Sequence, residues 1–175
     1  MNIEKISLPK DSLAASYFKK HHYADAYKAS FANPNKVTAS HVVKSFFTAT
    51  PAWVLWLTKI RNLVVKLFGL KTTSIKDIKE IINNFQGKVG ESFAGSFKVL
   101  AVKEGEILTG ETDKHLDFCL SFIIQERGHN YQISLVTVVH FNGCLGRFYF
   151  LPVKPMHKLI VRSLLKRMVK ELKSI

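Results

Sequence analysis

Acidic residues, cysteines and long uncharged apolar segments are all scarce in this sequence. Its 175 residues hold 13 Asp and Glu against 26 Lys and Arg, a formal net charge of +13. The two cysteines, Cys119 and Cys144, are too few for a disulfide scaffold and fit a reducing cytoplasmic setting, although one bridge between them stays open. The first residues lack the apolar core of a signal peptide, so we expect a cytoplasmic protein.

The most apolar segment, residues 52–70, is interrupted by polar side chains. Lys59, Arg61, Asn62 and Lys66 fall within its nineteen positions, which argues against a transmembrane helix. Lying flat in a membrane interface is the alternative that this composition leaves open.

The excess of positive charge attracts anions, nucleic acid or anionic lipid. The basic residues are nevertheless spread along the chain, without a basic tail, zinc-finger spacing or RNA-binding signature. We therefore expect a basic solvated surface and no nucleic-acid partner. A phosphate-binding glycine loop, a dinucleotide fingerprint and a nucleophile elbow are also missing, so no cofactor is predicted.

The chain length suggests one domain, with residues 1–20 as a loosely ordered lead-in and residues 21–175 as the folded unit. The Tyr- and Phe-rich residues 23–31 indicate a strand. Helical spacing begins after Thr38 or Ser40, either of which is a suitable N-cap. A second helix begins at Pro51 and stops near Gly69, and residues 74–85 predict a short third helix.

The middle of the chain changes to strand periodicity. Residues 97–111 predict a hairpin that turns near Glu104-Gly105. Apolar and polar side chains alternate along residues 116–125, with the even positions apolar, and again along residues 131–141. Period-two spacing with short turns is typical of an antiparallel sheet with one strongly apolar face.

The C-terminal segment is helical again. A first piece covers about residues 142–151, and Pro152 and Pro155 interrupt or kink it. From Met156 onward apolar residues recur every four positions, and a basic stripe lies on the opposite side, formed by Lys158, Arg162, Lys166 and Lys170. This element order predicts an α+β fold, a curved antiparallel sheet around a long terminal helix, with a cavity between them.

Three stretches resemble an uncharacterised bacterial family, described as a domain of unknown function and sometimes attached to short-chain-dehydrogenase-like proteins. They are "PAWVLWLTKIRNLVVKLFGLKT", "GETDKHLDFCLSF" and "TVVHFNGCLGRFYFLPVKPMHKLIVRSLLKR". The resemblance implies a helix-grip fold like that of START domains and the birch-pollen allergen. It implies no activity, cofactor or catalytic residue. The matching elements are Arg61-Asn62, Gly69-Leu70-Lys71, Gly110-Glu111, Asp113, His115 to Phe118, Gly146-Arg147, Pro155, His157, Ile160-Val161 and Arg167.

The segment "GETDKHLDF" concentrates the candidate chemistry. On one extended strand Glu111, Asp113, His115 and Asp117 would share a face and could do acid–base work or hold a metal. The preferred interpretation is a turn at residues 112–114, which breaks that alignment and lets His115 pair with a carboxylate. Glu111, His115 and Asp117 therefore stay weak catalytic candidates, and no metal site is predicted.

An apolar small molecule is the predicted partner, because the interior is rich in aromatic residues. Arg61 interrupts an apolar helix face, so it either extends to water or pairs with a carboxylate such as Asp117 or Glu111. A ligand-binding module is the preferred function. The alternatives are an enzyme using residues 111–117 and a membrane-surface protein using the basic stripe. The expected ligand-binding residues are Arg61, Trp56, Phe118, Phe122, Tyr131 and Phe148.

Overall fold

The computed structural model describes residues 2–67, 84–93 and 97–175, with the backbone alone described for residues 60–67. The predicted third helix (apart from its last two residues), the stop at Gly69 and the side chain of Arg61 lie outside the described residues. The elements are β1 (Ile3–Ile6), α1 (Leu13–Tyr17), β2 (Tyr23–Ala32), α2 (Ala39–Thr48), α3 (Ala52–Leu67), β3 (Ser92–Phe93), β4 (Phe97–Lys103), β5 (Glu106–Thr112), β6 (Leu116–Arg127), β7 (Asn130–Phe141) and α5 (Cys144–Leu172).

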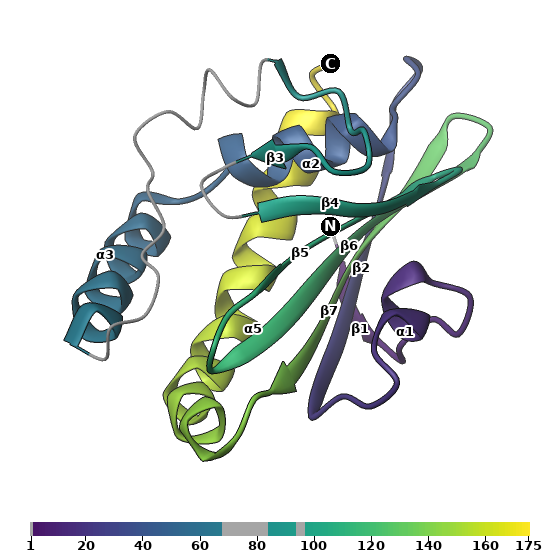
Figure 1. Cartoon of the computed structure of the whole chain (residues 1–175). Coiled ribbons are helices and arrows are strands. Elements are labelled where there is room, and N and C mark those ends of the chain that lie inside the picture. Colours follow the sequence, from purple (N-terminus) through teal and green to yellow (C-terminus); the bar gives the residue numbers. More distant parts are fainter. Residues whose placement is uncertain (1, 68–83, 94–96) are drawn as a thin grey trace.

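The strands form one antiparallel sheet in the order β1-β2-β7-β6-β5-β4-β3. Helix α5 and helix α2 cover one face of this curved sheet, and α1 lies on the opposite face (Figure 1). The α+β helix-grip architecture predicted from the sequence is thus confirmed. Two strands were missed: the short β3, and β1, which lies within the segment interpreted as a lead-in.

The main core lies between the sheet and the C-terminal half of α5. The even face of β6 and the odd face of β7 both point into it, as their alternation predicts, and Phe122, Ile133 and Leu135 are fully buried there. At the far end of β2, the side-chain amide of Asn33 donates to the carbonyl oxygen of Leu172 over 2.7 Å. This bond fixes the end of α5 to the sheet.

The second face of the sheet is also buried, which the sequence did not predict. Ala14 of α1 packs against Cys119, Val136 and Val138. The carboxylate of the buried Glu106 accepts a hydrogen bond from the backbone N–H of Leu13 over 2.8 Å. It also accepts one from the hydroxyl of Ser121 and forms an ion pair of 2.9 Å with Lys103. Glu106 therefore joins the N-terminal segment to the sheet.

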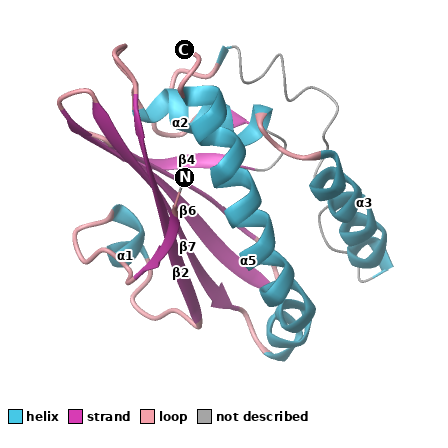
Figure 2. Cartoon of the chain, turned by 180° about the vertical axis from the view of Figure 1, so that it is seen from behind, coloured by secondary structure: helices cyan, strands magenta, loops and turns pink. Residues whose placement is uncertain are grey.

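Helix α2 begins at the residue that the sequence offered as a cap. The Thr38 hydroxyl accepts from the N–H of His41, whose ring receives the N–H of Thr38 in return, as in a capping box. Helix α3 follows, on the side of α5 away from the strands (Figures 1 and 2). None of the described helices combines the length and the apolar character that crossing a membrane would require.

The terminal helix runs without interruption from Cys144 to Leu172, with Pro152 and Pro155 inside it. The predicted interruption therefore does not occur, and the kink that the sequence offered as the alternative stays a prediction. Both prolines are exposed. Proline removes a backbone donor, and on an exposed face water can hydrate the carbonyl groups that lose their helical partners.

Candidate functional site

The segment "GETDKHLDF" forms a turn between β5 and β6. The Asp113 carboxylate accepts from the N–H of Lys114 over 2.6 Å, and its other oxygen lies 3.4 Å from Nδ1 of the buried His115. The turn separates Glu111 from Asp117, so the alignment on one strand face does not form. Asp117 lies on the same face as Cys119, away from α5, as the alternation along β6 predicts. No group of three or more metal-ligating side chains occurs among the described residues.

The aromatic residues expected to line a cavity do not meet at one site. Phe122 packs edge-on against Phe46, with 5.2 Å between ring centroids, and Tyr131 stacks on Phe31 in the main core. Phe118 is half-buried and meets the ring of Phe97 edge-on, at 5.5 Å between ring centroids. Trp56 and Phe148 are 61% and 71% exposed. Among the expected ligand-binding residues whose side chains the structure describes, only Phe148 lines one of the two described pockets.

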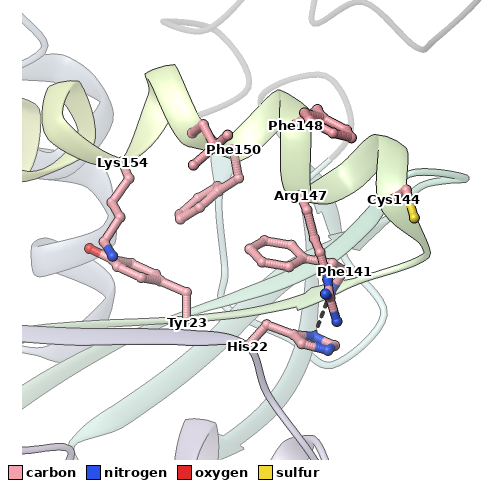
Figure 3. Close-up of a pocket in the computed structure, with 9 residues that line it drawn as sticks. His22, Tyr23, Phe141, Cys144, Arg147, Phe148, Phe150 and Lys154 are labelled. Atoms are coloured by element: carbon pink, nitrogen blue, oxygen red, sulfur yellow. Dashed lines mark hydrogen bonds between the residues drawn. The ribbon is translucent and has the colours of Figure 1, made fainter.

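A pocket of about 420 Å³ lies between the first turns of α5 and the start of β2 and end of β7 (Figure 3). We call it the α5–β2 pocket. The glycine before α5 has φ of 97°, a left-handed conformation that lets the chain turn sharply from β7 into the helix. Its lining residues are His22, Tyr23, Phe141, Cys144, Arg147, Phe148, Phe150, Leu151 and Lys154.

Apolar rings form most of the pocket wall. Phe150 packs against Tyr23 at 4.8 Å and against Phe141 at 5.3 Å between ring centroids. His22 stacks on Phe141 and receives the backbone N–H of that residue on its Nδ1. Because these rings support one another, the wall is formed before any ligand arrives.

Cationic groups lie at both ends of the pocket. The Lys154 ammonium lies 5.7 Å from the centre of the Tyr23 ring. Arg147 reaches from the helix toward His22 (Figure 3). Burial, together with the charges of His140 and Arg147, lowers the pKa of His22. No Asp or Glu is among the described residues that line the pocket. It therefore combines an apolar interior with a positive rim.

A buried polar network is connected to the pocket through Tyr23, one of its lining residues. The Tyr23 hydroxyl donates to Asp25 over 2.6 Å, and the same carboxylate lies 3.2 Å from Nε2 of His157 on α5. The Asp25 side chain is 1% exposed. Burial opposes its charge, but His157 and Tyr23 outweigh burial and lower the pKa of Asp25. Burial and this hydrogen bond raise the pKa of Tyr23. The network joins α5 to β2.

A second pocket of about 580 Å³ lies further along the same side of α5. Lys5 of β1 and Lys158 and Arg162 of α5 are its cations, and no acidic residue is among its described lining residues. We call it the α5–β1 pocket. The basic character of the first pocket thus continues along the helix.

The two cysteines differ sharply in accessibility. Cys144 is exposed and lines the α5–β2 pocket, whereas Cys119 is fully buried in the sheet. Burial raises the pKa of the Cys119 thiol to about 12. Both thiols are free, so the bridge that the sequence left open does not form.

A family model described as "Protein of unknown function (DUF2867)" matches residues 17–164. The chain belongs to this family. No curated protein matches this chain. Among solved structures, the crystal structure of Ara h 8.0201 is similar, with 10% identity and a TM-score of 0.33. The similarity covers 85% of this chain and 99% of that one. The helix-grip assignment rests on the strand order and on α5.

Sequence reasoning missed most of the pocket of this DUF2867 protein. Asp25 and His157 are 132 positions apart, and His22, Phe141 and Arg147 come from the loop before β2, from β7 and from α5. The sequence did hold a partial signal of the pocket. Arg147 and Lys154 lie on the apolar side of the terminal helix, and they interrupt its apolar spacing.

Proposed function

We propose that this chain binds a small amphipathic anion, a molecule with an apolar body and an acidic head, in the α5–β2 pocket. The observation that carries the proposal is the combination of stacked rings inside with Arg147 and Lys154 at the rim. Burying the apolar body in such a wall contributes about 25 cal/mol per Å². The cations favour an anionic head, because no acidic residue among the described lining residues competes for them.

The size and position of the pocket support this function. Its volume of about 420 Å³ lies in the range of small-molecule sites. The interior between sheet and helix is filled by buried side chains such as Phe122 and Leu135. The ligand therefore enters at the side of α5 rather than at the centre of the molecule.

The direct test compares two probes of one chain length. Decanoate and decanol are each titrated against the protein and detected by native mass spectrometry and by displacement of an anionic naphthalene-sulfonate dye. We expect decanoate to bind more tightly, because only its head carries charge. Equal affinity for the two probes would show that the cations do not contribute to binding. If neither probe binds, the proposal is overturned.

A pair of variants locates the site. Arg147→Gln with Lys154→Gln is expected to weaken decanoate binding by about tenfold, a loss of about 1.4 kcal/mol, and to leave decanol binding unchanged. The control is Lys88→Gln with Lys98→Gln, which removes the same charge from exposed positions remote from the pocket. If the control lowers the affinity for decanoate equally, the effect is due to net charge and not to these two residues of the pocket.

The alternative of an enzyme that uses Glu111, His115 and Asp117 stays a prediction, as does an association with short-chain-dehydrogenase-like proteins. The turn at residues 113–115 gives Asp113 and His115 a structural role, because the Asp113 carboxylate accepts from the Lys114 N–H and lies beside the His115 ring. Docking on a membrane, the other alternative, concerns the outward side of α5, which adjoins the pocket at Phe148 and Leu151.

A further inference from the structure

The outward face of α5 carries a continuous stripe of exposed side chains that changes character along its length. Each member follows the last by three or four positions, the spacing of one helix face. The first five members are apolar and the last three are basic. In order they are Leu145, Phe148, Pro152, Pro155, Leu159, Arg162, Lys166 and Lys170, and all are exposed. We call this set the outward stripe.

The apolar half of the outward stripe is not part of the core. The residues of α5 that pack on the sheet, such as Val161 and Leu165, lie on the opposite side of the helix. Phe148 is 71% exposed and Leu159 is 65% exposed, while Leu151 and Met156 beside them are 66% and 39% exposed. Contiguous exposed apolar side chains of this size are typical of a surface that contacts a partner.

Helix α3 adds two large aromatic side chains on the same side of the sheet. Trp53 and Trp56 are 42% and 61% exposed. Figures 1 and 2 both place α3 on the side of α5 that faces away from the strands. Tryptophan is the side chain that prefers the boundary between water and lipid, because its ring is apolar and its N–H is polar.

We propose that the outward stripe docks on the surface of an anionic lipid bilayer. The apolar half would enter the boundary between headgroups and acyl chains, and Arg162, Lys166 and Lys170 would contact the anionic headgroups. Charge decides between this occupant and a second copy of the chain. The stripe contains no acidic residue, so a self-complementary contact would have no anionic partner for its three cations.

The docking surface is separate from the ligand proposal, although the two meet at Phe148 and Leu151, which line the α5–β2 pocket as well. Leu145 and Leu159 do not line that pocket. Substitutions at these two positions therefore test docking without altering the ligand site.

The test is sedimentation of the full chain with vesicles of phosphatidylcholine, with and without phosphatidylglycerol, at low and high salt. We expect sedimentation only with phosphatidylglycerol, weakened by salt because screening reduces the attraction. Trp53 and Trp56 are the only tryptophans in the chain, so a blue shift of intrinsic fluorescence reports their entry into the lipid. A protein that stays in the supernatant at low salt with the anionic vesicles overturns the proposal.

Two matched pairs of double variants separate the apolar from the basic half. Leu145→Gln with Leu159→Gln is expected to weaken binding to the anionic vesicles by about tenfold or more. Its control, Val89→Gln with Val102→Gln, changes two exposed valines that lie outside α5 and should bind as the parent does. The variant Lys166→Glu with Lys170→Glu should also weaken binding to the anionic vesicles. Its control is Lys88→Glu with Lys98→Glu, which changes the net charge by the same amount and should weaken this binding much less.

Two results would contradict docking through this face. If each control lowers binding as much as its partner variant, the attraction is one of overall charge or surface polarity. If sedimentation velocity shows that the parent protein is a dimer and that Leu145→Gln with Leu159→Gln is a monomer, the stripe joins two copies of the chain.

Discussion

Gly146 on α5 lies directly against the backbone carbonyl of His115, in the turn between β5 and β6. A β-carbon added at Gly146 would come within 2.1 Å of that oxygen and 3.3 Å of the Phe141 side chain. His115 in turn meets the ring of Tyr149 edge-on, at 4.8 Å between centroids. Two of the stretches that carry the family resemblance therefore join at this point, and the contact fixes where the helix begins to cross the sheet.

Gly146→Ala is expected to destabilise the fold by more than about 1 kcal/mol. In an exposed helix the same change stabilises by about 1 kcal/mol, because alanine is the better helix former. The sign of the change in the free energy of unfolding therefore shows whether close packing or helix propensity dominates at this position. Chemical denaturation measures that change. Arg167→Ala, at an exposed position on the same helix, is the control and should change stability little. A more stable Gly146→Ala protein would show that the helix can move away from the turn.

Glu106→Ala should loosen the N-terminal segment as well as lower stability. The substitution leaves the Leu13 N–H and the Ser121 hydroxyl without their acceptor and Lys103 without its ion pair. We expect a loss of about 2–4 kcal/mol, since hydrogen bonds to a buried charged group are strong. Limited proteolysis should then cleave within residues 1–20. Glu104→Ala, in the exposed turn nearby, should resist cleavage as the parent does; equal resistance in both variants would contradict this role of Glu106.

Asp25→Asn should alter the acid dependence of stability. The folded-state pKa of Asp25 lies below its ordinary value of 3.8. The charged carboxylate therefore contributes stability above pH 3.8, and the contribution is lost as pH falls through the lowered pKa. We expect the variant to lose about 1–3 kcal/mol near neutral pH and to approach the parent in strong acid. Urea denaturation at several pH values checks this, with the exposed Asp11→Asn as control; a constant difference across the range would argue against it.

Thiol titration should find one reactive cysteine in the native protein and two after unfolding. Cys144 is exposed, whereas Cys119 is buried with a pKa raised to about 12. The thiolate is the reacting form, so Cys119 should stay unmodified until the protein unfolds. Decanoate should slow modification of Cys144, because that residue lines the α5–β2 pocket. Modification of Cys144 at an unchanged rate, under conditions where decanoate is bound, would place the ligand elsewhere.

Much of the fold could be predicted because its signals are local. The alternation of β6 and β7 places their apolar side chains on one face, and the four-residue recurrence from Ile160 to Leu172 gives the buried face of α5. The Thr38 cap and the Glu104-Gly105 turn depend on neighbouring residues only. The predicted turn at residues 112–114 is confirmed for the same reason, since Asp113 bonds the backbone next to it.

The two missed strands and the continuous α5 show the limits of such signals. Strand β1 has four residues and depends on pairing with β2, so nothing within it marks it as a strand. Pro152 and Pro155 ordinarily end a helix. Here they lie on the exposed face, and the packing of Phe150 and Val153 against the sheet carries the helix past them.

The sequence by itself determined the fold class and the interior faces of β6, β7 and the C-terminal half of α5, and it favoured a turn over a shared strand face in the segment "GETDKHLDF". Periodicity and turn chemistry act between residues a few positions apart, and a sequence displays those distances directly. Only the tertiary structure decided that Phe122 and Tyr131 fill the core while Trp56 and Phe148 are exposed, and that a pocket forms beside α5. It also brought Asp25 to His157, because a contact across 132 positions depends on strand order and helix placement.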